Sequence, residues 1–287
     1  MDKYVIVMDV SGDVCLETVN KYDLKFISMQ YSLGDEMRTS YGREPEDIMK
    51  KFYDGQRSGD LTQTSQITPY MYEEYFSKFL DEGYSVLYLC LSSGLSSTFS
   101  ASLLAKESLK EKYPDLDVYT VDSLSATGGM GILIERALLN REKGMGIKEN
   151  YEDMIGAVSH AHCWFLVQDL QYLKRGGRVS STTAFVGGIL NIKPILKITP
   201  EGKLTTIGKK RGNKAAVEEL FRIFKENFNP EYGKTIYLCD GDAKDLSNAL
   251  KDKVLSLYPD LDVKQVTLSP IIGAHTGPGM LAICNFA

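Results

Sequence analysis

Short apolar runs alternate with helical patterns along almost the whole chain, and this alternation constrains the fold more than any other feature. Residues 85–91 (SVLYLCL) form such a run, which a helical pattern up to about Lys112 and a second run at 116–123 follow. Runs of this length between polar turns indicate buried strands, and a helix between two of them indicates a parallel βαβ unit. We therefore expect an α/β protein with largely parallel strands.

The same alternation predicts the other helices and strands. Thr68 is expected to cap one helix, with Pro69 in the first helical position. The remaining strands are expected at residues 4–8, 26–31, 163–168, 195–198, 204–207 and 235–239. The remaining helices are expected at residues 43–56, 125–140, 149–159 and 215–228. Residues 235–268 are expected to form a strand, a turn, a helix and a second strand.

A short internal repeat supports a division into two domains. The hexapeptide YPDLDV occurs at 113–118 and again at 258–263, each time after an apolar strand and a helix. A chain of 287 residues is long enough for two modest domains. We expect an N-terminal α/β domain at residues 1–160 and a C-terminal α/β domain at residues 161–287.

Charge and cysteine content exclude several classes of protein. The formal net charge is -5, and only the segment 208–214 (GKKRGNK) gathers cations, so no nucleic-acid partner is expected. The five cysteines are scattered without a CxxC pair, which indicates free thiols in a reducing compartment and neither a zinc site nor disulfides. No apolar run approaches the roughly 18 residues of a membrane span, and the N-terminus does not resemble a signal peptide. We expect a cytoplasmic protein without a metal or another cofactor.

The serine-rich segment 91–98 (LSSGLSST) lies where an apolar strand gives way to a helix. A nucleophile elbow requires G-x-S-x-G, which is absent here, and a Ser-His-acid triad is disfavoured in a chain with three histidines. A helix cap formed by Ser96 and its neighbours explains the segment. An anion cradle explains it equally well, because free backbone N–H groups and hydroxyls gather at such a helix N-terminus. The residues alone leave both readings open.

Three further segments are candidate sites. Residues 61–69 (LTQTSQITP) form either a polar loop before a helix or a group of ligand-binding hydroxyls. Residues 174–182 (KRGGRVSST) are too short for a Walker loop and form either a surface turn or a cationic site. In residues 271–281 (IIGAHTGPGML), three glycines and a hydroxyl surround His275, a pattern that suggests the edge of a ligand site. His160 and His162 are interpreted as structural residues with weak metal-binding potential.

Six motifs occur in one order along the chain: TSQ at 64–66, LSSGLSST at 91–98, LQYLKRGGRVS at 170–180, NIKPIL at 191–196, KKRGNKA at 209–215 and GAHTGPG at 273–279. Together they resemble the DegV family, whose members are similar to the fatty-acid-binding subunits of bacterial fatty acid kinase. The resemblance implies a two-domain α/β protein with one long-chain fatty acid buried between its domains. The protein would not be a catalyst by itself. It would present the carboxylate to an ATP-dependent kinase partner, whose acyl phosphate product enters phospholipid synthesis, and transient membrane contact is compatible with this role.

The resemblance also assigns residues. It places the carboxyl group of the fatty acid against Thr64 or Ser65 and against Ser92 or Ser93, with Gly94 in the same loop and His275 close by. It places Arg178 and Arg211 at the mouth of the site, where they would dock the partner or offset phosphate charge.

The sequence departs from the family pattern at three places. Ile67 replaces a proline after TSQ and is expected to loosen the turn that orients Thr64. Ser97 replaces a glycine and is expected to lie one turn into the helix. Residues 9–13 read DVSGD where the family has D-S-T-x-D. None of these changes is expected to abolish the head-group site, and the motifs do not specify the length or unsaturation of the acyl chain.

Two alternatives remain at this point. One is an α/β phosphosugar or phosphate-ester enzyme that uses the serine loop as a phosphate cradle, with Asp9, Asp13 and Asp122 as acids at strand ends. The other is a regulatory module that holds lipid only as structural filler.

Overall fold

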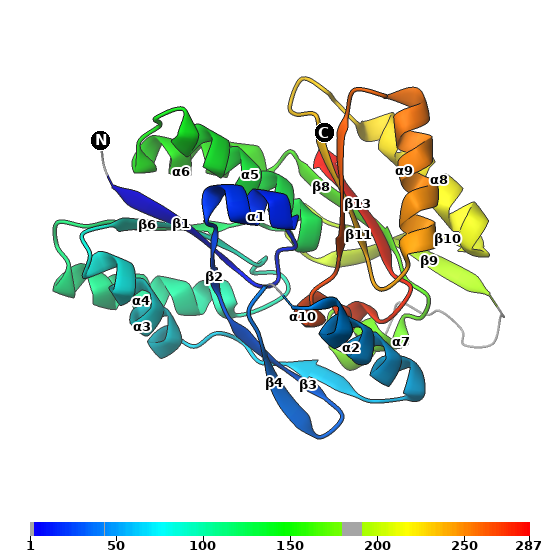
Figure 1. Ribbon diagram of the computed structural model, residues 1–287, viewed down its shortest axis with the longest axis horizontal. Coiled ribbons are helices and arrows are strands. Elements are labelled where there is room, and N and C mark those ends of the chain that lie inside the picture. The colour runs from blue at the N-terminus through cyan, green and yellow to red at the C-terminus, as the bar shows by residue number, and fades with distance from the viewer. Residues whose placement is uncertain (1–2, 43, 180–190) are drawn as a thin grey trace.

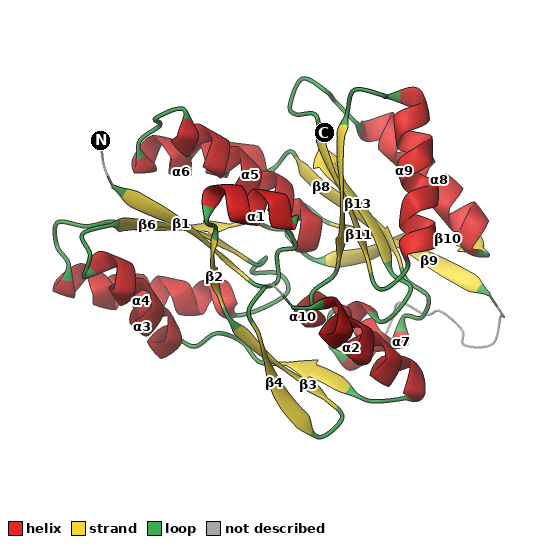
Figure 2. Ribbon diagram, viewed as in Figure 1, coloured by secondary structure: helices red, strands yellow, loops and turns green. Residues whose placement is uncertain are grey.

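A computed structural model of the chain describes residues 3–42, 44–179 and 191–287, and these residues form three β-sheets with helices around them (Figures 1 and 2). The first sheet has the strand order β2-β1-β6-β7, and all of its pairs are parallel. Its strands are β1 (Tyr4–Asp9), β2 (Lys25–Ile27), β6 (Ser85–Cys90) and β7 (Val118–Asp122).

Helices cover both faces of the first sheet (Figure 1), and every residue of β6 is therefore buried. Val7 and Tyr88 pack on one face against α3 (Pro69–Leu80) and α4 (Thr98–Lys112). Ile6 and Leu87 pack on the other face against three helices. These are α1 (Leu16–Tyr22), α5 (Thr127–Glu142) and α6 (Ile147–Val158).

The second sheet has the strand order β10-β9-β8-β13-β11-β12. Its strands are β8 (Ala161–Leu166), β9 (Ile192–Ile198), β10 (Leu204–Arg211), β11 (Thr235–Asp240), β12 (Asp262–Thr267) and β13 (Leu281–Phe286). Helices α8 (Asn213–Asn227) and α9 (Lys244–Leu257) cover its outer face. On its inner face, Phe165 and Cys284 share an apolar core with α5, which therefore lies between the two large sheets.

The expectation of largely parallel strands is wrong for this second sheet. Only β11 and β12 are parallel, while the other four pairs are antiparallel. A parallel pair needs a crossover connection, which α9 supplies between β11 and β12. A tight turn between β9 and β10 reverses the chain instead, with Gly202 donating its N–H to the Thr199 carbonyl at 2.8 Å.

The third sheet is small and antiparallel, with the order β4-β3-β5. Its strands are β3 (Met29–Leu33), β4 (Glu36–Ser40) and β5 (Thr62–Thr64), and α2 (Glu46–Ser58) precedes β5. The C-terminal helix α10 (Pro270–Thr276) lies beside this sheet. The Gln56 Nε2 donates to the Gly273 carbonyl at 3.0 Å, and the Thr62 hydroxyl donates to the Ala274 carbonyl at 2.9 Å. Helix α10 is thereby fixed to the N-terminal half of the chain.

Most expected elements are confirmed. Thr68 caps α3 through its side chain, and both βαβ units around YPDLDV are present as parallel pairs. The single strand expected at 26–31 is wrong, because the chain leaves the first sheet after β2 and enters the third with β3. Ser97 occupies the N-cap position of α4, one residue before the helix, so its expected place one turn inside is also wrong.

The strands of the first and third sheets all precede residue 123, and those of the second sheet all follow residue 160. The division into domains at 160/161 remains a prediction. Across residues 3–42, 44–179 and 191–287, no helix combines the length and apolar character needed to cross a bilayer. The five cysteines carry no disulfide, and four of them are buried.

Candidate functional site

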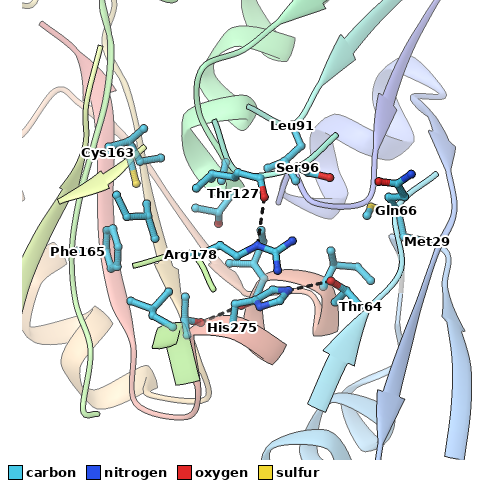
Figure 3. A pocket seen from close by; sticks show the side chains of 18 of the residues that line it. Met29, Thr64, Gln66, Leu91, Ser96, Thr127, Cys163, Phe165, Arg178 and His275 are labelled. Carbon is cyan, nitrogen blue, oxygen red and sulfur yellow. Dashed lines mark hydrogen bonds between the residues drawn. The ribbon is translucent and has the colours of Figure 1, made fainter. Parts of the chain in front are cut away.

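A cavity of about 470 Å³ lies where the first and second sheets, α5 and α10 meet (Figure 3). Its wall is apolar over much of its extent, with side chains from β8, α7 (Gln171–Arg175), β9 and β10. The apolar residues of the wall include Cys163, Phe165, Leu173, Ile198 and Leu204 from these elements and Met280, which precedes β13 (Leu281–Phe286). Pockets of about 300–1,000 Å³ with such walls are typical of small-molecule sites.

One end of the cavity is polar. Thr64 is the last residue of β5, and its hydroxyl oxygen lies 2.8 Å from Nε2 of His275 in α10 (Figure 3). Ser65 and Gln66, which follow Thr64, also line the cavity. Burial and, to a lesser degree, the neighbouring charge of Arg178 lower the pKa of His275 to about 4, so the imidazole is neutral near pH 7.

The serine loop after β6 supplies further hydroxyls. Ser93, Ser96 and Ser97 line the cavity. The Ser96 hydroxyl, one residue before the N-cap Ser97, accepts a hydrogen bond at 3.2 Å from the backbone N–H of Thr98, the first residue of α4. The Ser93 hydroxyl makes no hydrogen bond to another residue of the described ranges, whereas its backbone N–H donates to Asp122 Oδ1 at 3.1 Å. The loop therefore binds a backbone N–H at the start of α4 and presents one hydroxyl that has no partner among the described residues.

Ser92 and Gly94 do not line the cavity. The Ser92 side chain is fully buried, and its hydroxyl donates to the Gly202 carbonyl at 2.8 Å. A Cβ on Gly94 would lie 2.6 Å from the same carbonyl oxygen, so only glycine fits there. The structure therefore gives these two residues a different position from the expected one, because they attach the serine loop to the β9–β10 turn.

The two arginines lie in different environments. Arg178 lines the cavity and is the only residue on its wall, within the described ranges, with a permanent charge. Its Nε donates to the Leu95 carbonyl at 3.1 Å, its Nη1 donates to the Gly176 carbonyl, and burial lowers its pKa. Arg211 is the last residue of β10, is exposed and does not line the cavity. Residues 180–182 of the candidate segment 174–182 lie outside the described residues.

The three candidate acids, Asp9, Asp13 and Asp122, all accept hydrogen bonds from other residues of the fold. Asp9 accepts hydrogen bonds from the Tyr88 hydroxyl and the Leu91 backbone N–H, both at 2.8 Å. Asp13 accepts from the Thr127 hydroxyl at 2.6 Å and from the Ser269 backbone N–H at 2.8 Å, and burial raises its pKa to about 7. None of the three acids lines the cavity. They hold the strand ends and loops that shape it.

The other two histidines have ring partners. His160 stacks on Tyr232 with ring centroids 4.2 Å apart, and His162 stacks on Trp164 at 5.2 Å. In the described ranges no three His, Cys, Asp or Glu side chains are arranged to hold a metal ion.

The residues of the cavity that sequence reasoning missed are mainly apolar. Phe165, Leu173 and Met280 carry no signal that separates them from ordinary core residues. Thr127, which also lines the cavity, begins α5 with the left-handed φ of 48°, and only the tertiary structure reveals this conformation.

Comparisons with known proteins agree on one family. A family model described as an uncharacterised protein of the DegV family matches residues 3–287. A DegV domain-containing protein of Clostridium perfringens is 33% identical over 99% of this chain and 97% of its own length. A DegV family protein from Thermus thermophilus, described as fatty acid binding, is similar in structure with a TM-score of 0.83 and 26% identity, covering 99% of each chain.

A further structural neighbour is the fatty acid kinase (Fak) B3 protein of Streptococcus pneumoniae, solved with linoleic acid. Its TM-score is 0.85 over 99% of each chain, and at 19% identity the likeness concerns the fold.

Proposed function

This chain belongs to the DegV family, and on that premise we propose that it binds one long-chain fatty acid in the cavity, with the carboxyl group at the polar end. The observation that carries the proposal is the composition of the cavity wall. Its apolar part suits an acyl chain, and hydroxyls, a neutral imidazole and one guanidinium gather at the other end. The fatty acid binding described for the relative from Thermus thermophilus supports the same ligand class.

The acyl chain supplies the affinity. Each buried methylene gains about 0.8 kcal/mol, so a tail of ~16 carbons gains on the order of 10 kcal/mol before the costs of ordering. This gain is large enough to retain a lipid through purification.

The carboxyl group needs partners, because burying an unpaired charge is costly. If Nε2 of His275 carries the ring proton, it donates to the Thr64 hydroxyl oxygen, and the Thr64 proton is free to donate to the ligand. The Ser93 hydroxyl supplies a second donor, and the charge of Arg178 offsets that of the carboxylate. Ser65 is a further donor, whereas Ser92 and Gly94 position the loop.

We further infer that the protein presents this carboxyl group to an ATP-dependent fatty acid kinase, which forms the acyl phosphate. The fold neighbour named as a fatty acid kinase B3 protein supports the inference. In this role the chain is a non-catalytic subunit, Arg178 lies at the head group and the exposed Arg211 docks the partner. A cytoplasmic location and transient membrane contact accompany this role as predictions. If Arg178→Ala and Arg211→Ala both left kinase-coupled acyl phosphate formation unchanged, the role of the arginines would be wrong.

A phosphate-ester enzyme is not favoured. Such an enzyme needs acids that face its substrate, and Asp9, Asp13 and Asp122 bond to the fold outside the cavity wall.

A titration tests the ligand class. Delipidated protein is titrated with hexadecanoate, hexadecanol and a sugar phosphate, and binding is measured by calorimetry. We expect hexadecanoate to bind most tightly, hexadecanol more weakly because it lacks the carboxylate, and the sugar phosphate not at all. Saturable binding of the sugar phosphate without hexadecanoate binding would contradict the proposal.

A further inference from the structure

A second hollow of about 400 Å³ adjoins the polar end of the fatty-acid cavity. Thr64, Arg178 and His275 line both spaces, so these three side chains form the wall between them. We call the second hollow the outer pocket and define it by these three residues together with Gln63, Tyr172 and Arg175. A group attached to a carboxyl oxygen at the wall would extend from the cavity into this pocket.

The charge of the outer pocket is positive. Arg175 and Arg178 both line it, and none of its lining residues in the described ranges is acidic. The Gln63 carboxamide adds an uncharged polar group, whereas the Thr62 hydroxyl donates to the Ala274 carbonyl. Guanidinium groups match the oxygens of a phosphate with paired hydrogen bonds, so this set of residues suits a phosphoryl dianion.

Arg175 has a fixed support although it is exposed. Its guanidinium lies over the ring of Tyr172, 4.7 Å from the centroid. The Tyr172 hydroxyl donates to the Gln56 carbonyl in α2 at 3.2 Å, which holds the ring in place. Stacking on an aromatic face restrains a guanidinium and leaves its N–H groups free to bind a ligand.

The wall between the two spaces is held in place by close contacts. Arg178 donates to the carbonyls of Leu95 and Gly176, so its side chain is held at the boundary. A Cβ on Gly176 would lie 2.3 Å from Nδ1 of His275, so only glycine allows the end of α7 to pack this closely against the imidazole.

We propose that the outer pocket holds a phosphoryl group attached to the carboxyl end of the bound acyl chain, with Arg175 as its additional contact. The inference rests on the proposed function, since the acyl chain must occupy the inner cavity. It gives this chain a site for the product of the kinase step, with Arg175 acting only on the phosphorylated ligand.

The test compares two lipids on delipidated protein: hexadecanoate, and hexadecyl phosphate, whose phosphorus lies two bonds beyond C1 as in an acyl phosphate. The variant is Arg175→Gln, and the matched control is Lys174→Gln, which removes the same charge from the preceding residue of α7 outside the pocket lining. We expect Arg175→Gln to weaken hexadecyl phosphate binding about tenfold and hexadecanoate binding less than about twofold. Lys174→Gln should change neither affinity by more than about twofold.

The outcomes separate the two proposals. If the unmodified protein does not bind hexadecanoate, the proposed function fails. If hexadecanoate binds but Arg175→Gln leaves hexadecyl phosphate binding unchanged, or weakens both lipids equally, the inference alone is overturned. Inorganic phosphate added to hexadecanoate-loaded protein tests a free phosphoryl group, and Arg175-dependent binding as tight as that of hexadecyl phosphate would contradict attachment to the acyl chain.

Discussion

The hydroxyl oxygen of Thr64 lies 2.8 Å from Nε2 of His275, although 211 positions separate the two residues in the sequence. Thr64 ends β5 of the third sheet, and His275 lies in α10, which the second half of the chain contributes. The polar end of the cavity therefore forms only when α10 packs beside the third sheet.

Replacing Thr64 by valine removes the hydroxyl and keeps the shape of the side chain. We expect Thr64→Val to weaken fatty acid binding about tenfold, because a donor to the carboxylate is lost and His275 loses its partner. The change is measured by calorimetric titration of delipidated protein with hexadecanoate. The matched control is Thr206→Val, since the Thr206 hydroxyl is buried without a hydrogen-bond partner in the described ranges and lies outside the cavity. Equal affinity of the Thr64 variant and the control would contradict the role of Thr64.

Ser92 and Ser93 are neighbours with different predicted roles. Ser93→Ala should leave the free energy of unfolding within about 0.5 kcal/mol of the parent and reduce the retained fatty acid. Ser92→Ala should reduce the free energy of unfolding by about 1–2 kcal/mol, because the buried Gly202 carbonyl loses its donor. Urea unfolding and lipid content by mass spectrometry separate the effects. The assignment is wrong if Ser93→Ala retains as much lipid as the parent.

Gly94 holds the serine loop close to the β9–β10 turn. A Cβ at this position would lie 2.6 Å from the Gly202 carbonyl oxygen, which belongs to the backbone and cannot rotate away. We expect Gly94→Ala to reduce the free energy of unfolding by about 2 kcal/mol or more. Gly208→Ala is the control, because a Cβ on Gly208 would meet no described atom within 4 Å and the change should be neutral. A Gly94 variant as stable as the control would show that the loop moves freely.

His275 makes stability depend on pH. Its pKa is about 4 in the folded protein against 6.5 in an unfolded chain, so between these values the unfolded chain binds a proton that the folded chain does not. The His275 contribution to folding stability is therefore lost as pH falls from about 6.5 to 4. Asp13 acts in the opposite direction. Its pKa is raised from 3.8 to about 7, so between these pH values the folded chain binds a proton that the unfolded chain does not. The Asp13 contribution to folding stability therefore increases as pH falls from about 7 to 3.8.

The variant His275→Gln isolates the histidine contribution. Relative to this variant, the delipidated parent should lose about 3 kcal/mol of unfolding free energy between pH 7 and pH 4. Urea unfolding at a series of pH values measures the difference. Parallel stability curves for parent and variant would contradict a buried neutral histidine.

The local sequence was sufficient to predict most helices and strands and part of the site. The Thr68 cap, the buried strand β6 and the serine loop at its end follow from residue patterns within a few positions. The motifs that resemble the DegV family indicated Thr64 and His275, and the structure places both on the cavity wall.

Contacts between distant segments could not be predicted in this way. Ser92 and Ser93 are identical in type and adjacent, and only the position of Gly202 determines which hydroxyl is used inside the fold. The antiparallel pairing in the second sheet likewise depends on where β13 enters it. Apolar wall residues such as Phe165 have the same local pattern as core residues, because a cavity is defined by what surrounds it.

The most direct measurement of the central claim is the identity of the bound molecule. The purified protein is extracted with organic solvent, and the extract is analysed by mass spectrometry and quantified against the protein. We predict about one equivalent of a long-chain monocarboxylic acid per chain, reduced in Thr64→Val and unchanged in Thr206→Val. An extract without lipid, from a protein that also fails to take up hexadecanoate, would contradict the account.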